Sequence, residues 1–252
     1  MIILLSPAKS LDFENSFPEV EATQPRFVDD SLKIIKKLRS LSRKKISSMM
    51  GLSKELTELN YMRYHEWDTQ FDKATSVPAM MAFSGEVYRG LNARGFTPKQ
   101  VQFASNHLRI LSGLHGVLRG SDLIRPYRLE MGTSLPVGRK KNLYAIWKEK
   151  VVGALNKDAE TMENQVVINL ASSEYFKAVD FDAFKGRVIT PVFKDEKNGQ
   201  YKVIMTWAKN ARGKMARFII ENNITNPEHI KGFEDYAFNE AMSTETEWVF
   251  IR

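Results

Sequence analysis

Short apolar runs along the chain have the length and composition of buried β-strands. Residues 2–5 (IILL) are continuously apolar and stop at Ser6-Pro7, as expected for a strand covered on both faces. Other runs combine β-branched or aromatic residues with turn residues at their ends. These predicted strands are residues 78–85 (PAMMAFSG), 165–172 (QVVINLAS), 187–193 (RVITPVF) and 247–252 (EWVFIR). Residues 108–113 (LRILSG) fit either a short strand or the end of the preceding helix.

Other stretches have apolar residues at the spacing of three and four that gives a helix one buried face. In residues 29–42 (DDSLKIIKKLRSLS) the apolar side chains fall on one side and the lysines on the other. The stretch 96–108 (FTPKQVQFASNHL) starts with Thr97, Pro98 and Gln100, which match the capping box of a helix start. Further helices are predicted from Glu86 onward and over residues 208–223 (AKNARGKMARFIIENN).

A β-hairpin is predicted where Asn198-Gly199 lies between two apolar runs, with residues 202–207 (KVIMTW) as the return strand. Strands and helices are interspersed, but they do not alternate regularly as in a doubly wound fold. We therefore predict an α+β fold in one domain over residues 1–252, with a mixed central β-sheet flanked by helices. No linker, internal repeat or low-complexity segment divides the chain.

The composition narrows the possible chemistry. A hydrophobic content of 43% over 252 residues is enough for a substantial core. The absence of cysteine excludes disulfides, thiolate metal sites and cysteine nucleophiles, and the four histidines lack the spacing of a helical metal motif. We therefore predict no metal site and no cofactor, although histidines and carboxylates that are distant in the sequence could still converge on a metal in the fold. The N-terminal apolar run is too short for a signal peptide or a membrane span, so we expect a cytoplasmic protein with no membrane partner.

The charge is unevenly distributed. The net charge of +7 favours polyanionic partners. The stretch from Ser31 to Lys54 contains eight basic residues and no acidic one. These basic residues are Lys33, Lys36, Lys37, Arg39, Arg43, Lys44, Lys45 and Lys54. Several contacts with phosphates would make binding steeply dependent on salt.

The basic stretch ends in a sequence that resembles the helix-hairpin-helix of DNA-repair proteins. Residues 46–61 (ISSMMGLSKELTELNY) place Gly51 and Leu52 at the bend, and the whole element is expected to span about residues 43–63. Ser53 is a good N-cap for the second helix, whose first N–H groups favour an anion, and Lys54 adds a charge beside it. Two amphipathic helices joined by a glycine turn would give the same pattern, and Ser53 stands where the motif has a second glycine.

Polar residues that follow the predicted strands suggest a cleft. Lys9 follows the first strand, at the position where ligands often bind, and it is a candidate phosphate ligand or nucleophile or simply a surface lysine. Glu130 and Glu174 are further catalytic candidates if they meet Lys9 there. Cationic candidates for binding DNA are Arg125 and Arg128, with Glu130 as an alternative ion-pair partner, and Lys209 and Arg212 at a helix start.

Residues 113–116 (GLHG) have the GxxG form that clamps a nucleic-acid backbone in some modules, although so short a match arises often by chance. No catalytic triad, P-loop or metal motif identifies a reaction.

Five motifs together resemble the YaaA family of bacterial peroxide-stress-resistance proteins, nearly from end to end. They are SPAKSLDF (6–13), LSGLHGVLRGSDLIRPYRLEMGTSL (111–135), VVINLASSEYFKAV (166–179), PVFKDEKNGQYKVI (191–204) and ARGKMARFIIENNIT (211–225). The resemblance implies a family-specific fold with a helix-hairpin-helix and a basic cleft, and a protein that binds duplex or branched DNA. It also implies a role in lowering free iron and limiting oxidative DNA damage. Gly120-Ser121 and His115 depart from the Pro-Leu and Tyr common in the family.

Three functions remain open from the sequence. The first is a DNA-binding protein of the oxidative stress response that reads the backbone. The second is an enzyme that acts on a nucleotide or damaged nucleic acid around Lys9. The third is an iron-handling protein, which would need oxygen and nitrogen ligands because no cysteine is available.

Overall fold

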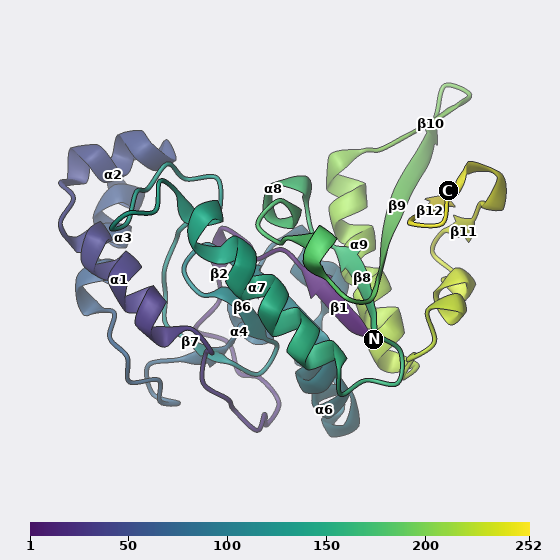
Figure 1. Cartoon of the computed structure of the whole chain (residues 1–252), viewed down its shortest axis with the longest axis horizontal. Coiled ribbons are helices and arrows are strands. Elements are labelled where there is room, and N and C mark those ends of the chain that lie inside the picture. Colours follow the sequence, from purple (N-terminus) through teal and green to yellow (C-terminus); the bar gives the residue numbers. More distant parts are fainter.

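Strand β1 (Ile2–Leu5) lies in the middle of an eight-stranded mixed sheet in the computed structural model, which describes residues 1–252 (Figure 1). All four of its side chains are completely buried, as its unbroken apolar sequence requires. Four more strands run parallel to it in the order β5, β1, β8, β9 and β12. Their bounds are β5 Leu108–Ser112, β8 Val166–Leu170, β9 Arg187–Lys197 and β12 Glu247–Ile251.

Antiparallel strands extend this parallel centre at its edges. They are β6 (Gly116–Arg119) beside β5, β11 (Ala237–Phe238) beside β12, and β10 (Gln200–Lys202), which forms a hairpin with β9. The β9–β10 hairpin projects from the body of the molecule in Figure 1. The predicted mixed sheet and the α+β class are therefore confirmed.

Helices cover the sheet and form a group of their own at one end. At that end lie α1 (Val28–Arg39), α2 (Arg43–Met50) and α3 (Lys54–Glu66), on the left of Figure 1. The other helices are α5 (Glu86–Leu91), α6 (Pro98–His107), α7 (Leu143–Ala159), α8 (Ser173–Phe176) and α9 (Met205–Glu221). The capping box predicted for α6 is present, with Thr97 and Gln100 bonded reciprocally to each other's backbone N–H groups. The long helix α7 was not predicted.

Helices α5 and α9 approach each other closely because each contributes a glycine at the crossing. A Cβ atom on Gly213 would lie only 1.8 Å from the carbonyl oxygen of Val87. A Cβ atom on Gly90 would lie 2.3 Å from the carbonyl oxygen of Asn210. The two backbones therefore touch without intervening side chains, which fixes the position of α9 beside the sheet.

Two strand predictions were wrong. Residues 78–85 form three short pieces, which are β3 (Val77–Pro78), the single turn α4 (Ala79–Ala82) and β4 (Phe83–Ser84). The N–H groups of Ala79 and Met80 donate to carbonyls of Asp122 and Gly120, and this tertiary pairing bends the segment. The return strand predicted over 202–207 ends at Lys202, and α9 begins at Met205. Residues 108–113, for which two interpretations were open, form strand β5.

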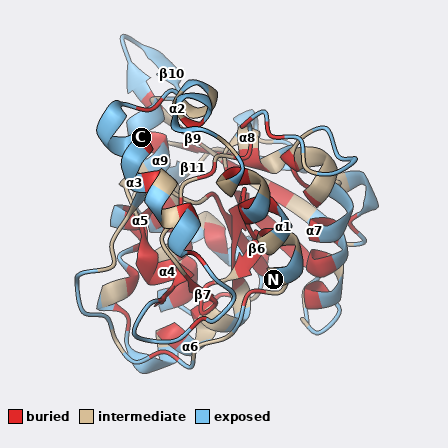
Figure 2. Cartoon of the chain, turned by 90° about the vertical axis from the view of Figure 1, so that its left-hand side faces the viewer, coloured by how far each residue is buried: buried red, intermediate tan, exposed pale blue.

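The core joins these elements in one cluster of 68 buried residues. Figure 2 shows the buried residues gathered along the sheet and on the inner sides of the helices. The remaining short strands are β2 (Ser10–Leu11), which pairs with β4, and β7 (Leu123–Ile124), which pairs with β3. Single 3-10 turns occupy Ala93–Gly95, Phe181–Ala183, Pro227–Gly232 and Glu240–Met242. None of the helices combines the length and the apolar character needed to cross a membrane.

Candidate functional site

The carboxyl ends of β1 and β8 open into a cavity of about 320 Å³, which we call the Lys9 cavity. Five separate parts of the chain meet there: the segment after β1, the β4–α5 segment, the segment that follows β7, the exit of β8 and the second turn of α9. Its charged lining residues are Lys9, Glu86, Arg128, Glu130, Glu174, Lys209 and Arg212. Ligands commonly bind at this edge of a parallel sheet. The segments predicted to share one cleft are therefore brought together.

Lys9 and Glu130 form an ion pair in this cavity. The Nζ atom of Lys9 lies 3.0 Å from a carboxylate oxygen of Glu130, whose other oxygen accepts a hydrogen bond of 3.2 Å from Arg128. The Lys9 side chain is 62% exposed. One carboxylate thus holds two cations at the cavity wall, and Glu130 plays the ion-pair role that the sequence left open.

Arg212 differs from these residues because it has no partner of its own. Its guanidinium group makes no ion pair and no hydrogen bond, although it lines the cavity and is only partly exposed. Burial lowers the pKa of Arg212 because desolvation disfavours the charged form. Lys209, almost one turn earlier on α9, also lines the cavity without an ion pair. A buried cation without a counter-charge is costly, and an anionic ligand would compensate it.

Hydroxyl and carboxylate groups complete the wall. The Oγ atom of Ser6 accepts a hydrogen bond of 2.8 Å from the N–H of Ser172, and the Ser6 carbonyl accepts one of 2.9 Å from the Tyr88 hydroxyl. A carboxylate oxygen of Glu174 accepts a hydrogen bond of 2.9 Å from the N–H of Gly132. Sequence reasoning missed Ser6 as a site residue, although its position directly after β1 was the signal that could have revealed it.

The bend between α2 and α3 is a glycine turn followed by a capped helix. Gly51 adopts a left-handed conformation with φ of 61° and is exposed, and the Ser53 side chain caps α3 by accepting a bond of 3.3 Å from the N–H of Leu56. Leu52 is buried, and its N–H donates to the carbonyl of Ser47 at 3.1 Å. This arrangement suits both an exposed phosphate-binding turn and plain helix packing, so the DNA-binding role of the element stays a prediction.

The cations near this bend fall into two groups. Lys44, Lys45 and Lys54 are exposed and make no ion pair. Arg43 instead makes a bidentate contact with Glu58 at 2.5 and 2.8 Å, and its guanidinium lies 3.7 Å from the centre of the Tyr61 ring. Hydrogen bonding to Arg43 in turn lowers the pKa of Glu58. The three lysines are therefore available to a ligand, whereas Arg43 holds α2 against α3.

Arg125 also has a structural partner. It lies 3.0 Å from a carboxylate oxygen of Asp68, and its Nε and Nη2 atoms donate to the carbonyl of Gln70 at 3.0 and 2.9 Å. These contacts fasten the loop after α3 to the segment after β7. Arg125 is therefore engaged in the fold, unlike Arg212.

The predicted site residues do not all share one surface. Arg128, Lys209 and Arg212 line the Lys9 cavity, but none of residues 43–54 does. The GxxG segment is buried and cannot clamp a backbone, because a Cβ atom on Gly116 would lie 2.5 Å from the Trp147 ring. No group of three histidine, aspartate or glutamate side chains converges as a metal site would require.

Comparison with known proteins assigns the family. The model of the family described as peroxide stress protein YaaA matches residues 1–242. The chain belongs to the YaaA family of peroxide stress proteins. Relatives named UPF0246 protein from Saccharophagus degradans and from Aliivibrio fischeri strain MJ11 are each 47% identical over 254 residues. The alignments cover 100% of this chain and 99% and 98% of those relatives. A UPF0246 protein of Burkholderia lata is 47% identical over 256 residues. The resemblance to YaaA proteins is thus confirmed, and membership of this family is consistent with a role in the oxidative stress response.

Proposed function

We propose that this YaaA-family protein binds duplex or branched DNA through the sugar-phosphate backbone. Through that binding it limits oxidative damage to DNA and the harm done by excess free iron. The observation that carries the proposal is a trio of unpaired, exposed lysines in the α2–α3 element, which are Lys44 and Lys45 at the start of α2 and Lys54 at the start of α3. Lys44 and Lys45 lie in the first turn of α2 and Lys54 in the first turn of α3, so each helix of the element contributes exposed cations to which phosphates could bind.

Backbone groups at the same bend support this proposal. The N–H groups of Ser53 and Lys54 make no backbone hydrogen bond, as is usual in the first turn of a helix. They lie at the positive end of the α3 dipole, where an anion is favoured. Contacts of this kind carry no base information, so binding is expected to depend on backbone shape and charge.

A binding assay tests the proposal. Fluorescence anisotropy with a labelled duplex and a four-way junction should show affinity that falls steeply with salt. Lys54→Glu should weaken binding at least fivefold, because it replaces a cation at the helix start by an anion. Lys99→Glu, an equal charge change at an exposed residue of α6, should bind like the parent protein. The proposal fails if the parent shows no salt-dependent binding, or if Lys54→Glu and Lys99→Glu bind equally well.

The Lys9 cavity supports a second candidate function, an enzyme that acts on a nucleotide or on damaged nucleic acid. Aromatic Tyr127 and Tyr175 line the cavity together with the Lys9–Glu130 pair and the unpartnered Arg212. This combination of an apolar wall and a few charged groups is typical of a small-molecule site. Chromatography of nucleotides and of oxidised oligonucleotides after incubation tests it. An absence of turnover across both substrate classes would remove this candidate.

A further inference from the structure

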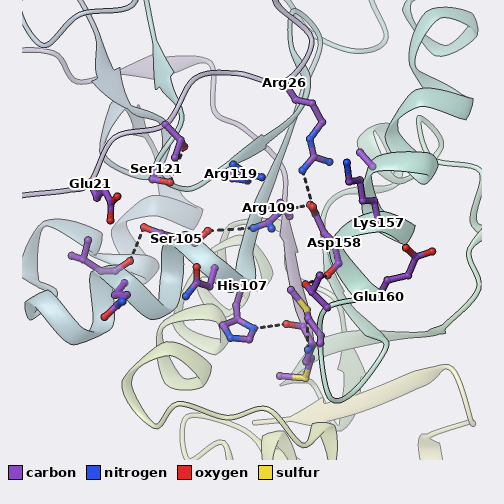
Figure 3. A pocket seen from close by; sticks show the side chains of 18 of the residues that line it. Glu21, Arg26, Ser105, His107, Arg109, Arg119, Ser121, Lys157, Asp158 and Glu160 are labelled. Carbon is purple, nitrogen blue, oxygen red and sulfur yellow. Dashed lines mark hydrogen bonds and ion pairs between the residues drawn. The ribbon is translucent and has the colours of Figure 1, made fainter.

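A larger cavity, of about 1480 Å³, lies at the opposite edge of the parallel sheet. Met1, which precedes β1, and Arg109 near the start of β5 both line it, whereas the Lys9 cavity lies at the other ends of β1 and β8. Figure 3 shows Arg109 among the residues that line this larger cavity. Its remaining walls come from α6, α7, the segment before α1, the end of β6 with the turn after it, and the segments that follow α7 and α9. We call it the amino-end chamber. Neither DNA binding at α2–α3 nor chemistry around Lys9 uses this chamber.

Two arginines share one carboxylate inside the chamber. The Nε atom of Arg109 donates to one oxygen of Asp158 at 2.7 Å, and the Nη2 atom of Arg26 donates to the other at 2.7 Å. Figure 3 shows Arg26 and Arg109 approaching Asp158 from two directions. Arg109 is only 5% exposed and Asp158 only 9% exposed. The group therefore carries one positive charge in excess within a poorly solvated site.

Arg119 adds a third guanidinium group that has no partner. It makes no ion pair and its side chain makes no hydrogen bond. The neighbouring Asp122 is already engaged, because its two oxygens accept hydrogen bonds of 2.6 Å from the Thr23 hydroxyl and 2.8 Å from the Arg119 N–H. The Nη1 atom of Arg26 is also buried without a hydrogen-bond partner. The guanidinium group of Arg119 and the Nη1 atom of Arg26 are thus hydrogen-bond donors without an acceptor.

A smaller recess of about 130 Å³ shares Arg26, Arg109, Arg119 and Asp158 with the chamber and so adjoins it. Its polar lining residues are Gln24, Arg26, Arg109, Arg119, Asp122 and Asp158. A recess of this volume has room for one oxyanion group. Three guanidinium groups face two carboxylates there, so a single negative charge restores the balance.

The outer part of the chamber excludes a long polyanion. Two lysines and four glutamates line it in addition to the recess, and these are Lys150, Lys157, Glu19, Glu21, Glu160 and Glu163. This excess of acidic groups repels a phosphate backbone. Hydroxyl groups of Thr23, Ser105, Ser121 and Thr161 also line the chamber. The chamber therefore matches a small polar molecule with one anionic end.

We propose that the amino-end chamber binds the phosphate or carboxylate group of a small polar molecule in the recess between Arg26 and Arg119. Guanidinium groups recognise both kinds of oxyanion through paired N–H donors. The body of the ligand then lies against the hydroxyl groups of the wider chamber. This site is separate from the surfaces proposed for DNA.

Calorimetric titration of the full-length protein with inorganic phosphate, and separately with succinate, tests the site at constant ionic strength. We expect saturable binding of at least one anion, and the anion that binds identifies the phosphate or carboxylate class. Arg119→Gln should weaken binding at least tenfold while leaving DNA affinity unchanged. Arg139→Gln, which removes an exposed and unpaired arginine, should bind like the parent.

Two further variants make the result decisive. Arg119→Lys keeps the charge but loses the paired donors, so its affinity should lie between those of Arg119→Gln and the parent. Arg212→Gln removes the unpaired cation of the Lys9 cavity, so it can abolish only a second binding event there and should leave the binding event of the amino-end chamber in place. The proposal is overturned if neither anion binds saturably, or if Arg212→Gln abolishes binding while folded Arg119→Gln retains it.

Discussion

Lys9 and Arg212 line the same cavity, but only Lys9 has a carboxylate partner. Lys9 is held 3.0 Å from Glu130, whereas Arg212 makes no ion pair or hydrogen bond. The two cations come from the two ends of the chain, from the segment after β1 and from helix α9. An anion that enters the cavity therefore meets one cation already neutralised and one that still lacks a counter-charge.

Replacing Arg212 by methionine should stabilise the fold, although it removes a cation from the Lys9 cavity. Arg212→Met removes an uncompensated, partly buried charge and keeps the length of the side chain. We expect the free energy of unfolding to rise by about 1 kcal/mol, because an apolar replacement of a buried charge is often stabilising. Urea denaturation measures this change. A loss of stability greater than about 1 kcal/mol would instead show that the guanidinium supports the fold.

Asp158 should control stability in acid. Burial alone would raise the pKa of Asp158, but the Arg109 and Arg26 guanidinium groups outweigh burial and lower it. The stabilisation is therefore present above the ordinary carboxyl pKa of about 3.9 and disappears as the pH falls through the lower folded value. Asp158→Asn should cost about 3–5 kcal/mol at pH 7, because it leaves two arginines unpaired. The cost should shrink below about pH 4 in urea unfolding experiments; a constant cost would contradict the prediction.

His115 should contribute a second dependence on pH. Its side chain is completely buried, and desolvation lowers its pKa to about 3. Below about pH 6.5 the unfolded chain binds a proton that the folded protein does not, so stability should fall by up to about 1.4 kcal/mol per pH unit. His115→Phe should remove this part of the slope between about pH 6 and pH 4, measured by urea unfolding. The exposed His229→Gln is the control and should keep the parent's slope.

Glu55 should compete with DNA at the start of α3. Its pKa is lowered by hydrogen bonds from its own backbone N–H and from the Ser53 hydroxyl. The carboxylate thus occupies part of the place proposed for a phosphate. Glu55→Gln should raise affinity for duplex DNA about threefold, which corresponds to roughly 0.6 kcal/mol. Glu149→Gln on α7 provides the same charge change at another exposed residue and should have no comparable effect.

Replacing glycine by alanine should have opposite effects on stability at Gly213, which lies in the α5–α9 contact, and at Gly153, which lies on α7. Gly213→Ala places a Cβ atom 1.8 Å from the Val87 carbonyl oxygen and should destabilise the protein by about 3 kcal/mol or more. Gly153→Ala on α7 meets no atom within 4 Å. It should stabilise the protein by about 0.5–1 kcal/mol, because alanine favours a helix over glycine. Thermal unfolding compares the two, and equal melting temperatures would refute the close contact.

Local patterns predicted much of the sheet, since strands such as β1 and β8 are continuously apolar and buried on both faces. The strand-exit argument also placed Lys9 and Glu174 in one cavity with α9. The pattern failed at residues 78–85, where pairing with the 120–122 turn decides the conformation of an apolar stretch.

Long-range geometry was less visible in the sequence. Arg26, Arg109 and Arg119 form the recess of the amino-end chamber, yet they come from three elements and follow no spacing rule. Helix α7 buries Leu143, Trp147, Val151 and Leu155, a stripe at every fourth residue that periodicity could have revealed. The Lys9–Glu130 pair depends on how the segment after β7 folds back, which no single stretch of sequence specifies.

The direct backbone contact at Gly90 and Gly213 has a consequence for ligand entry. Helix α9 carries Lys209 and Arg212. Because no side chains separate α9 from α5 at this contact, α9 cannot easily shift relative to α5. The part of α9 that carries Lys209 and Arg212 is therefore in position before a ligand binds, so binding requires little ordering of the helix. We therefore expect the Lys9 cavity to bind only ligands that fit its present size.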